Sequence, residues 1–340
     1  MQHKSITALT AVATWVIMSA RVVAQTASPT ASPEPIATST STAPGPGEAG
    51  ASEGTGPPDT GGFDVSKLTP EQQEALRLLI IKTSENPIGN ITVLPFKNYF
   101  NYGVGPYTRY GYSLNVEPVV PIMLSHSWNL IARTIASISS VPSFAPPGVC
   151  ASPTGCPWTT GLDDTQEQFF FAPKTKPGQL IWGVGPVFQF PTGTPSTLSA
   201  GKWCIGPDVV VLMTPGKWVY GALFAQIWSF AGPASRPNVS SLTAEPFIDY
   251  NIGHGWALAT SPIITANFTA AQNKWAVPLG GGISRTFKAG NQLMSLQLQY
   301  YTYVTRPLTS PQTTLQFNAA LLWPVKRGIN VEQLLEEAAH

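Results

Sequence analysis

The chain has 340 residues, and only 11% of them are charged, against roughly 25% in an average soluble domain. The formal net charge of +1 and the lack of a basic stripe argue against nucleic acid as a partner. The chain contains 10 Trp, 10 Tyr and 15 Phe, so the fold must accommodate a large apolar surface.

Residues 1–24 have the organisation of a secretory signal peptide. Lys4 precedes an apolar stretch that starts at Ile6, and Val22-Val23-Ala24 provides small residues for cleavage before Gln25. An N-terminal membrane anchor is the alternative, but the apolar stretch is short for a helical span. We therefore expect a cleaved leader and an exported chain.

A linker and a helix are predicted before the main domain. Residues 25–65 are rich in Ala, Ser, Thr, Pro and Gly, a composition that is typical of a disordered tether. Within 66–85, Thr69 suits a helix N-cap, Pro70 the first helical position and Gln72 the capping box. This helix has one apolar stripe, so it either packs in the periplasm against the domain or a partner subunit, or plugs the lumen.

Residues 86–326 consist of long segments in which apolar and polar residues alternate with a period of two. In Gln292–Val304, for example, Leu296 and Leu298 fall on one face while Gln297 and Gln299 fall on the other. Twelve strands are predicted, at 91–104, 111–124, 128–141, 164–173, 179–191, 202–213, 218–231, 240–252, 256–269, 273–287, 292–305 and 313–325.

Segments of this length suit strands that cross a bilayer, which need about 9–11 residues, whereas strands in soluble proteins average about 5–6. The pattern therefore favours an all-β fold, a transmembrane antiparallel up-and-down β-barrel of about twelve strands, over a soluble sandwich or jelly roll. Short turns alternate with longer loops, which is the periplasmic and extracellular asymmetry of outer-membrane barrels. Both ends of residues 86–326 then lie on the periplasmic side.

Several prolines fall inside the predicted strands, where a residue without an N–H removes a ladder hydrogen bond. We interpret six of them as bulges that curve the wall. These six are Pro118, Pro121, Pro207, Pro246, Pro262 and Pro278.

Alternation also assigns side chains to the inside of the barrel. A charge that faces lipid at mid-membrane costs about 2–4 kcal/mol for Arg or Lys, so charged strand residues must point inward. Pairing about the turn at 125–127 places Arg133 opposite Val119 and makes it a diagonal neighbour of Glu117. The candidate lumen-lining residues are Asn115, Glu117, Arg133, Gln226, Glu245, Asp249, Asn251, Gln297 and Gln299. The charged ones either hold the wall together or bias the choice of solute, and the two roles are compatible.

The three cysteines do not indicate a metal site, because their spacing is wrong and no histidine is near them in the sequence. Cys150 and Cys156 lie in the loop-like segment 142–163 and are candidates for a small disulfide in an oxidising compartment. Cys204 is expected to be a lone strand residue.

Several segments together resemble the family called the MetA-pathway of phenol degradation, a set of bacterial outer-membrane barrels. They are Asn86-Pro87-Ile88, Leu94–Asn98, Tyr102–Pro106, Ile181–Pro186, Trp228–Gly232, Ser261–Asn267 and Trp275–Pro278. The resemblance spans roughly 83–326 and implies an outer-membrane barrel that passes small, apolar or aromatic compounds. The chain differs from the family in its cysteine-bearing loop and in the tail 327–340, which follows the strand whose aromatic end the barrel-assembly machinery would read.

Enzymatic motifs are missing from the sequence. It has no Gly-x-Ser-x-Gly, HExxH or phosphate loop, and His126 and His254 lie in predicted tight turns. We therefore expect a channel or transporter for a small-molecule solute, surrounded by outer-membrane lipid and without a cofactor. A structural or surface-interaction barrel with a closed lumen is the alternative, and a lipid-modifying enzyme is a distant third. The sequence leaves the oligomeric state open.

Overall fold

The computed structural model describes residues 91–144, 157–175, 179–290 and 292–324. The signal peptide, the linker, the helix at 66–85, the tail at 327–340 and both Cys150 and Cys156 lie outside these residues. The described strands are β1 (Ile91–Val104), β2 (Arg109–Val116), β3 (Val119–Met123), β4 (Trp128–Pro142), β5 (Trp158–Leu162), β6 (Thr165–Pro173), β7 (Ile181–Phe190), β8 (Trp203–Met213), β9 (Trp218–Ala231), β10 (Ser240–Gly253), β11 (Trp256–Thr260), β12 (Ile264–Asn267), β13 (Trp275–Ala289), β14 (Gln292–Thr305) and β15 (Thr313–Pro324).

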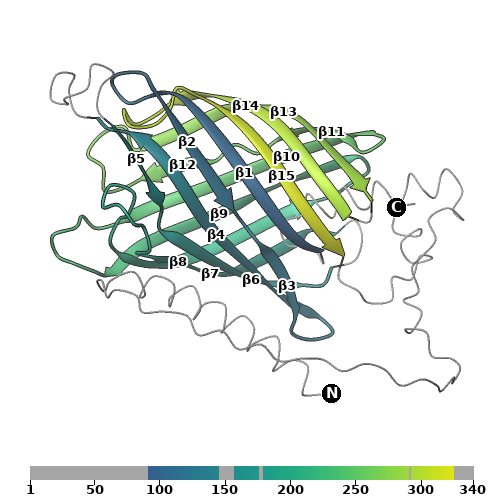
Figure 1. Cartoon of the computed structure of the whole chain (residues 1–340). Helices are drawn as coiled ribbons and strands as arrows, with labels where there is room; N and C mark the ends of the chain where they lie inside the picture. The colour runs from purple at the N-terminus through teal and green to yellow at the C-terminus, as the bar shows by residue number, and fades with distance from the viewer. Residues whose placement is uncertain (1–90, 145–156, 176–178, 291, 325–340) are drawn as a thin grey trace, which may run out of the picture. The chain divides into compact units, whose positions relative to one another are not determined.

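These strands form one antiparallel sheet that closes on itself, with the pairing of β9 and β10 completing the ring (Figure 1). Three pairs, β2 with β3, β5 with β6 and β11 with β12, each make one interrupted wall strand, so the wall has twelve strands. The predicted fold class and strand number are confirmed. A correction concerns the loop predicted at 142–163, because β5 occupies residues 158–162 and pairs with the end of β4.

Two of the interruptions coincide with prolines that cannot donate to the ladder. β2 ends before Glu117-Pro118, and β11 ends before 261–263, which contains Pro262. The wall remains closed at the first interruption, since the Glu117 N–H donates to the Pro95 carbonyl and the Thr134 N–H to the Pro118 carbonyl, both at 3.1 Å.

The remaining four of these six prolines do not all lie at bulges. Pro278 lies at a register shift between β13 and β14, as a bulge would require. The register continues through Pro121 in the β3–β4 pair, through Pro207 in the β7–β8 pair and through Pro246 in the β9–β10 pair. The prediction of bulges at these three positions is therefore wrong.

The connections alternate between the two ends of the barrel as predicted. One end carries the short turns at 124–127, 214–217 and 254–255, and the facing ends of β6 and β7 and of β13 and β14 lie there too. The other end carries the longer connections at 191–202, 232–239, 268–274 and 306–312 and the tight turn 105–108, together with the end of β4 and the start of β5.

The turn between β10 and β11 gives a sharp test of backbone strain. Gly255 has φ +82°, and a Cβ there would lie 2.2 Å from the Thr286 carbonyl oxygen. We expect Gly255→Ala to lower the unfolding free energy by about 1–3 kcal/mol, measured by urea titration of the refolded barrel. Gly290, with φ +59° and open space around it, is the matched control and should cost less. Equal losses would show that steric contact with Thr286 is unimportant.

The outer surface carries two belts of tryptophan, one near each end of the wall. Trp128, Trp182, Trp218, Trp256 and Trp323 lie at the end with the short turns, and Trp158, Trp203, Trp228 and Trp275 lie at the other. Apolar side chains fill the outer face between the belts, among them Phe224, Ile248, Leu258, Leu298 and Phe317. Tryptophan prefers the membrane–water boundary, so the belts mark the two interfaces of a bilayer.

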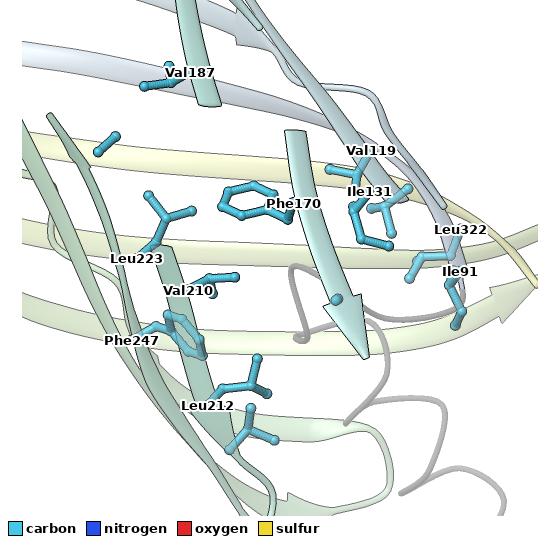
Figure 2. Close-up of a cluster of buried hydrophobic side chains, with 14 of the residues drawn as sticks. Ile91, Val119, Ile131, Phe170, Val187, Val210, Leu212, Leu223, Phe247 and Leu322 are labelled. Atoms are coloured by element: carbon cyan, nitrogen blue, oxygen red, sulfur yellow. The ribbon is translucent and has the colours of Figure 1, made fainter. Parts of the chain in front are cut away.

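The inner surface is divided between an apolar sector and a polar one. Buried side chains of β6 to β10, such as Phe170, Val210 and Leu223, form a cluster that reaches Ile91 of β1 and Leu322 of β15 (Figure 2). The polar sector lies on β13 to β15, with Ser284, Thr286, Ser295, Gln299, Gln316 and Asn318 buried. The barrel interior is therefore partly filled by its own side chains.

Candidate functional site

Four charged side chains meet inside the barrel. Arg133 of β4 contacts Glu117 (Nη2–Oε2, 2.6 Å), and Lys97 of β1 contacts the same carboxylate oxygen at 3.0 Å. Glu245 of β10 lies 3.4 Å from Lys97 and 3.5 Å from Arg133. Each base thus has two carboxylate neighbours, and each carboxylate has two bases. We call these four residues the ion bridge.

The interruption of the second wall strand positions Glu117. This residue lies between β2 and β3 and is only 2% exposed, and the Asn115 amide donates to its Oε1 at 3.2 Å. Arg133 pairs with Val119 in the β3–β4 register, as the hairpin pattern predicted. The predicted proximity of Glu117 and Arg133 is confirmed.

Glu245 reaches the other three residues across the bore. In the ring, β10 is separated from β1 by β15, β14, β13 and the β11–β12 strand on one side, and from β4 by β6, β7, β8 and β9 on the other. The contacts of Glu245 therefore cross the lumen and do not follow the wall. The ion bridge connects opposite sides of the barrel and obstructs the lumen at this level.

The burial of these charges makes the arrangement rigid. A buried charge is costly unless it is paired, and removal of one partner from a buried pair is strongly destabilising. Glu117 and Arg133 are both buried, and the side chains of Lys97 and Glu245 are about 14% and 15% exposed. The two residues with more exposure are the pair that joins β1 to β10, so this contact is the easiest part of the ion bridge to open.

A cavity of about 160 Å³ adjoins the ion bridge. Its apolar lining includes Val93, Val119, Leu223, Phe247 and Leu322, and its uncharged polar lining includes Ser261, Ser295, Gln297 and Asn318. Asp249 is a further charged residue at this cavity. The cavity can hold a small molecule with an apolar body and a polar end.

The structure places the predicted lumen residues in three groups. Asn115, Glu117, Arg133 and Glu245 belong to or contact the ion bridge, and Asp249 and Gln297 line the cavity. Asn251 and Gln299 are buried on the inward faces of their strands. The Asn251 amide donates to the Lys217 carbonyl at 3.0 Å, and Gln299 accepts from the Tyr301 hydroxyl at 3.1 Å.

Gln226 departs from the expectation. It alternates with the inward residues Leu223, Ala225 and Ile227 and shares its face of β9 with Phe224 and Trp228, which are exposed. It therefore points away from the lumen. Its amide donates to the Ile227 carbonyl at 3.2 Å, which provides a partner for a polar group on the outer surface.

Two inward charged residues were missed from the sequence. Lys97 shares the inward face of β1 with Val93 and Pro95, and the rule that placed the other charges inside would have placed it there too. Asp208 of β8 is 0% exposed, and neither of its carboxylate oxygens has a hydrogen-bond partner among the described residues. It lies in an apolar strand segment, so the alternation of polar and apolar residues did not identify it as an inward residue.

One carboxylate, that of Glu167, lies on the outer face of the wall and not in the lumen. Glu167 of β6 pairs with Thr134 of β4 on the outer face, next to Phe169 and Phe171. The Thr134 hydroxyl donates to Glu167 Oε2 at 2.7 Å. Glu167 thus serves as a carboxylate outside the lumen against which substitutions inside can be compared.

Comparisons with solved structures bear on the fold. The chain is similar to an outer membrane channel from Pseudomonas putida F1, with a TM-score of 0.51 and 16% identity, over 68% of this chain and 94% of that one. A NanC porin aligns over 68% of this chain and all of its own, with a TM-score of 0.43 and 11% identity. A FadL homologue from Pseudomonas aeruginosa aligns over 70% and 92%, with a TM-score of 0.33 and 10% identity.

The fold is that of an outer-membrane barrel. The first of these similarities supports this statement, while the other two are too distant to carry an argument. No family model matches the chain, and no curated protein matches it either. Among the described residues there is no helix long and apolar enough to cross a membrane.

Proposed function

We propose that the protein is an outer-membrane channel or transporter for the passive passage of small, apolar or aromatic molecules. The observation that carries this proposal is the cavity inside the barrel, with apolar walls on one side and the ion bridge beside it. A solute that passes this level must fit the cavity and displace Glu245 from Lys97. The resemblance to the MetA-pathway family agrees with such a solute, and membership of that family is part of the proposal.

The outer membrane is the proposed location because the tryptophan belts enclose an apolar band on a closed antiparallel barrel. An outward-facing apolar band on a chain with a predicted leader suits lipid better than water. The assembly machinery of that membrane is then the expected partner during insertion.

A barrel with a closed lumen is the second candidate. It is favoured by the apolar cluster, which joins Ile91 and Leu322 to Phe170 and Leu212 from other parts of the wall (Figure 2). Twelve strands enclose a modest bore, and side chains can fill much of it. Such a barrel would serve as a scaffold for its loops.

Planar-bilayer recording on the refolded full chain separates the two candidates. A channel should give discrete conductance steps, small in size because the ion bridge narrows the lumen. Efflux of a small neutral aromatic solute from loaded vesicles should also be faster with the protein than without it. Silence in both assays, with heat-modifiable gel mobility confirming a folded barrel, would favour the closed scaffold.

A further inference from the structure

The cavity beside the ion bridge has an excess of negative charge. Five charged side chains among the described residues line it: the carboxylates Glu117, Glu245 and Asp249 and the bases Lys97 and Arg133.

The pairing within this group leaves one of the three carboxylates that line the cavity free. Lys97 and Arg133 each contact both Glu117 and Glu245, so these four charges balance one another. Asp249 is 7% exposed and has no ion pair within the described chain. The surroundings therefore offer an unpaired carboxylate to a cation.

The walls of the cavity define the rest of the ligand. Phe247 lies two residues before Asp249 on the same face of β10, and Leu223, Val93 and Leu322 complete an apolar surface. The Ser261 and Ser295 hydroxyls and the Gln297 amide add uncharged polar groups that can donate or accept. An ammonium group has three donors and no acceptor, which suits this lining. Roughly benzene-sized molecules fit cavities of about this volume.

We infer that the cavity binds small organic cations, with a primary ammonium group at Asp249 and an apolar body against Phe247 and Leu223. This inference rests on the proposed function, since it names the class of solute that would use the same lumen. A carboxylate of the same size and shape is disfavoured, because Asp249 and the net negative charge of the lining repel it.

The test compares n-butylammonium with butyrate, a carboxylate of similar size, as ligands of the refolded full chain in detergent, by isothermal titration. We expect n-butylammonium to bind at least tenfold more tightly than butyrate. Asp249→Asn should weaken n-butylammonium binding about tenfold. Glu167→Gln removes a carboxylate from the outer face and should leave binding unchanged. Equal binding of the two ions, or equal effects of the two substitutions, would overturn the inference.

Reversal potentials in a KCl gradient provide the second measurement and separate this inference from the proposed function. A conducting barrel that prefers potassium, with the preference reduced in Asp249→Asn, supports both. A conducting barrel that prefers chloride overturns the cation site and keeps the channel. A barrel that binds n-butylammonium but neither conducts nor speeds the efflux of the neutral aromatic solute keeps the cation site and rejects the channel.

Discussion

Replacing Glu245 with alanine is expected to raise the single-channel conductance severalfold. Glu245 alone connects β10 to the Lys97, Glu117 and Arg133 group on the other side of the bore. Its removal deletes the part of the ion bridge that crosses the lumen. The fold should be retained, because Lys97 and Arg133 each keep Glu117 as a partner. Planar-bilayer recording of the refolded variant measures the change.

Two further variants make this result interpretable. Glu245→Gln keeps the length of the side chain and loses its charge, so its conductance should lie between those of the parent and Glu245→Ala. Glu167→Gln alters a carboxylate on the outer face and should have the parent conductance. If Glu245→Ala conducts like the parent, the ion bridge does not limit conduction, and the constriction lies elsewhere in the lumen.

The second large effect concerns stability. Arg133→Met should lower the unfolding free energy by about 3 kcal/mol, because Glu117 loses its shortest contact, at 2.6 Å, while it remains buried. Lys97 remains close to Glu117 and limits the loss. Urea titration of the refolded barrel, followed by tryptophan fluorescence, measures the change.

A double-mutant cycle tests whether the effect belongs to the pair. Arg133→Met combined with Glu117→Gln removes both charges, so the cost should be clearly below the sum of the two single costs, with a coupling of about 1–3 kcal/mol. Additive costs would mean that the two residues stabilise the barrel independently. Glu167→Gln again provides a control.

These two experiments assign different roles to parts of one network. Glu117 and Arg133 come from adjacent wall strands, and their contact holds the wall together where β2 and β3 are interrupted. Glu245 comes from the opposite wall, and its contacts close the bore. The scaffolding role and the solute-path role that the sequence left open can therefore both apply, carried by different members of the ion bridge.

Local sequence pattern predicted the wall of the barrel with few errors. Period-two alternation identified twelve strands, since each strand shows lipid on one face and the interior on the other. The same alternation gave the register of the β3–β4 hairpin and thus the contact between Glu117 and Arg133. Where a polar residue lay on the outer face, as Gln226 does, polarity was a misleading guide, because a backbone carbonyl can satisfy an amide there.

The sequence by itself determined the strands, their inward and outward faces and the contacts between neighbours, because these depend on residues close together in the chain. Only the tertiary structure decided that Glu245 meets Lys97, 148 positions away, and that Asp249 faces an apolar cavity. The closure of the ring sets which strands oppose each other, and alternation carries no information about that. The physical reason is that contacts across the lumen depend on how the whole wall curves and closes. Contacts along the wall, by contrast, follow from the hydrogen bonds between neighbouring strands.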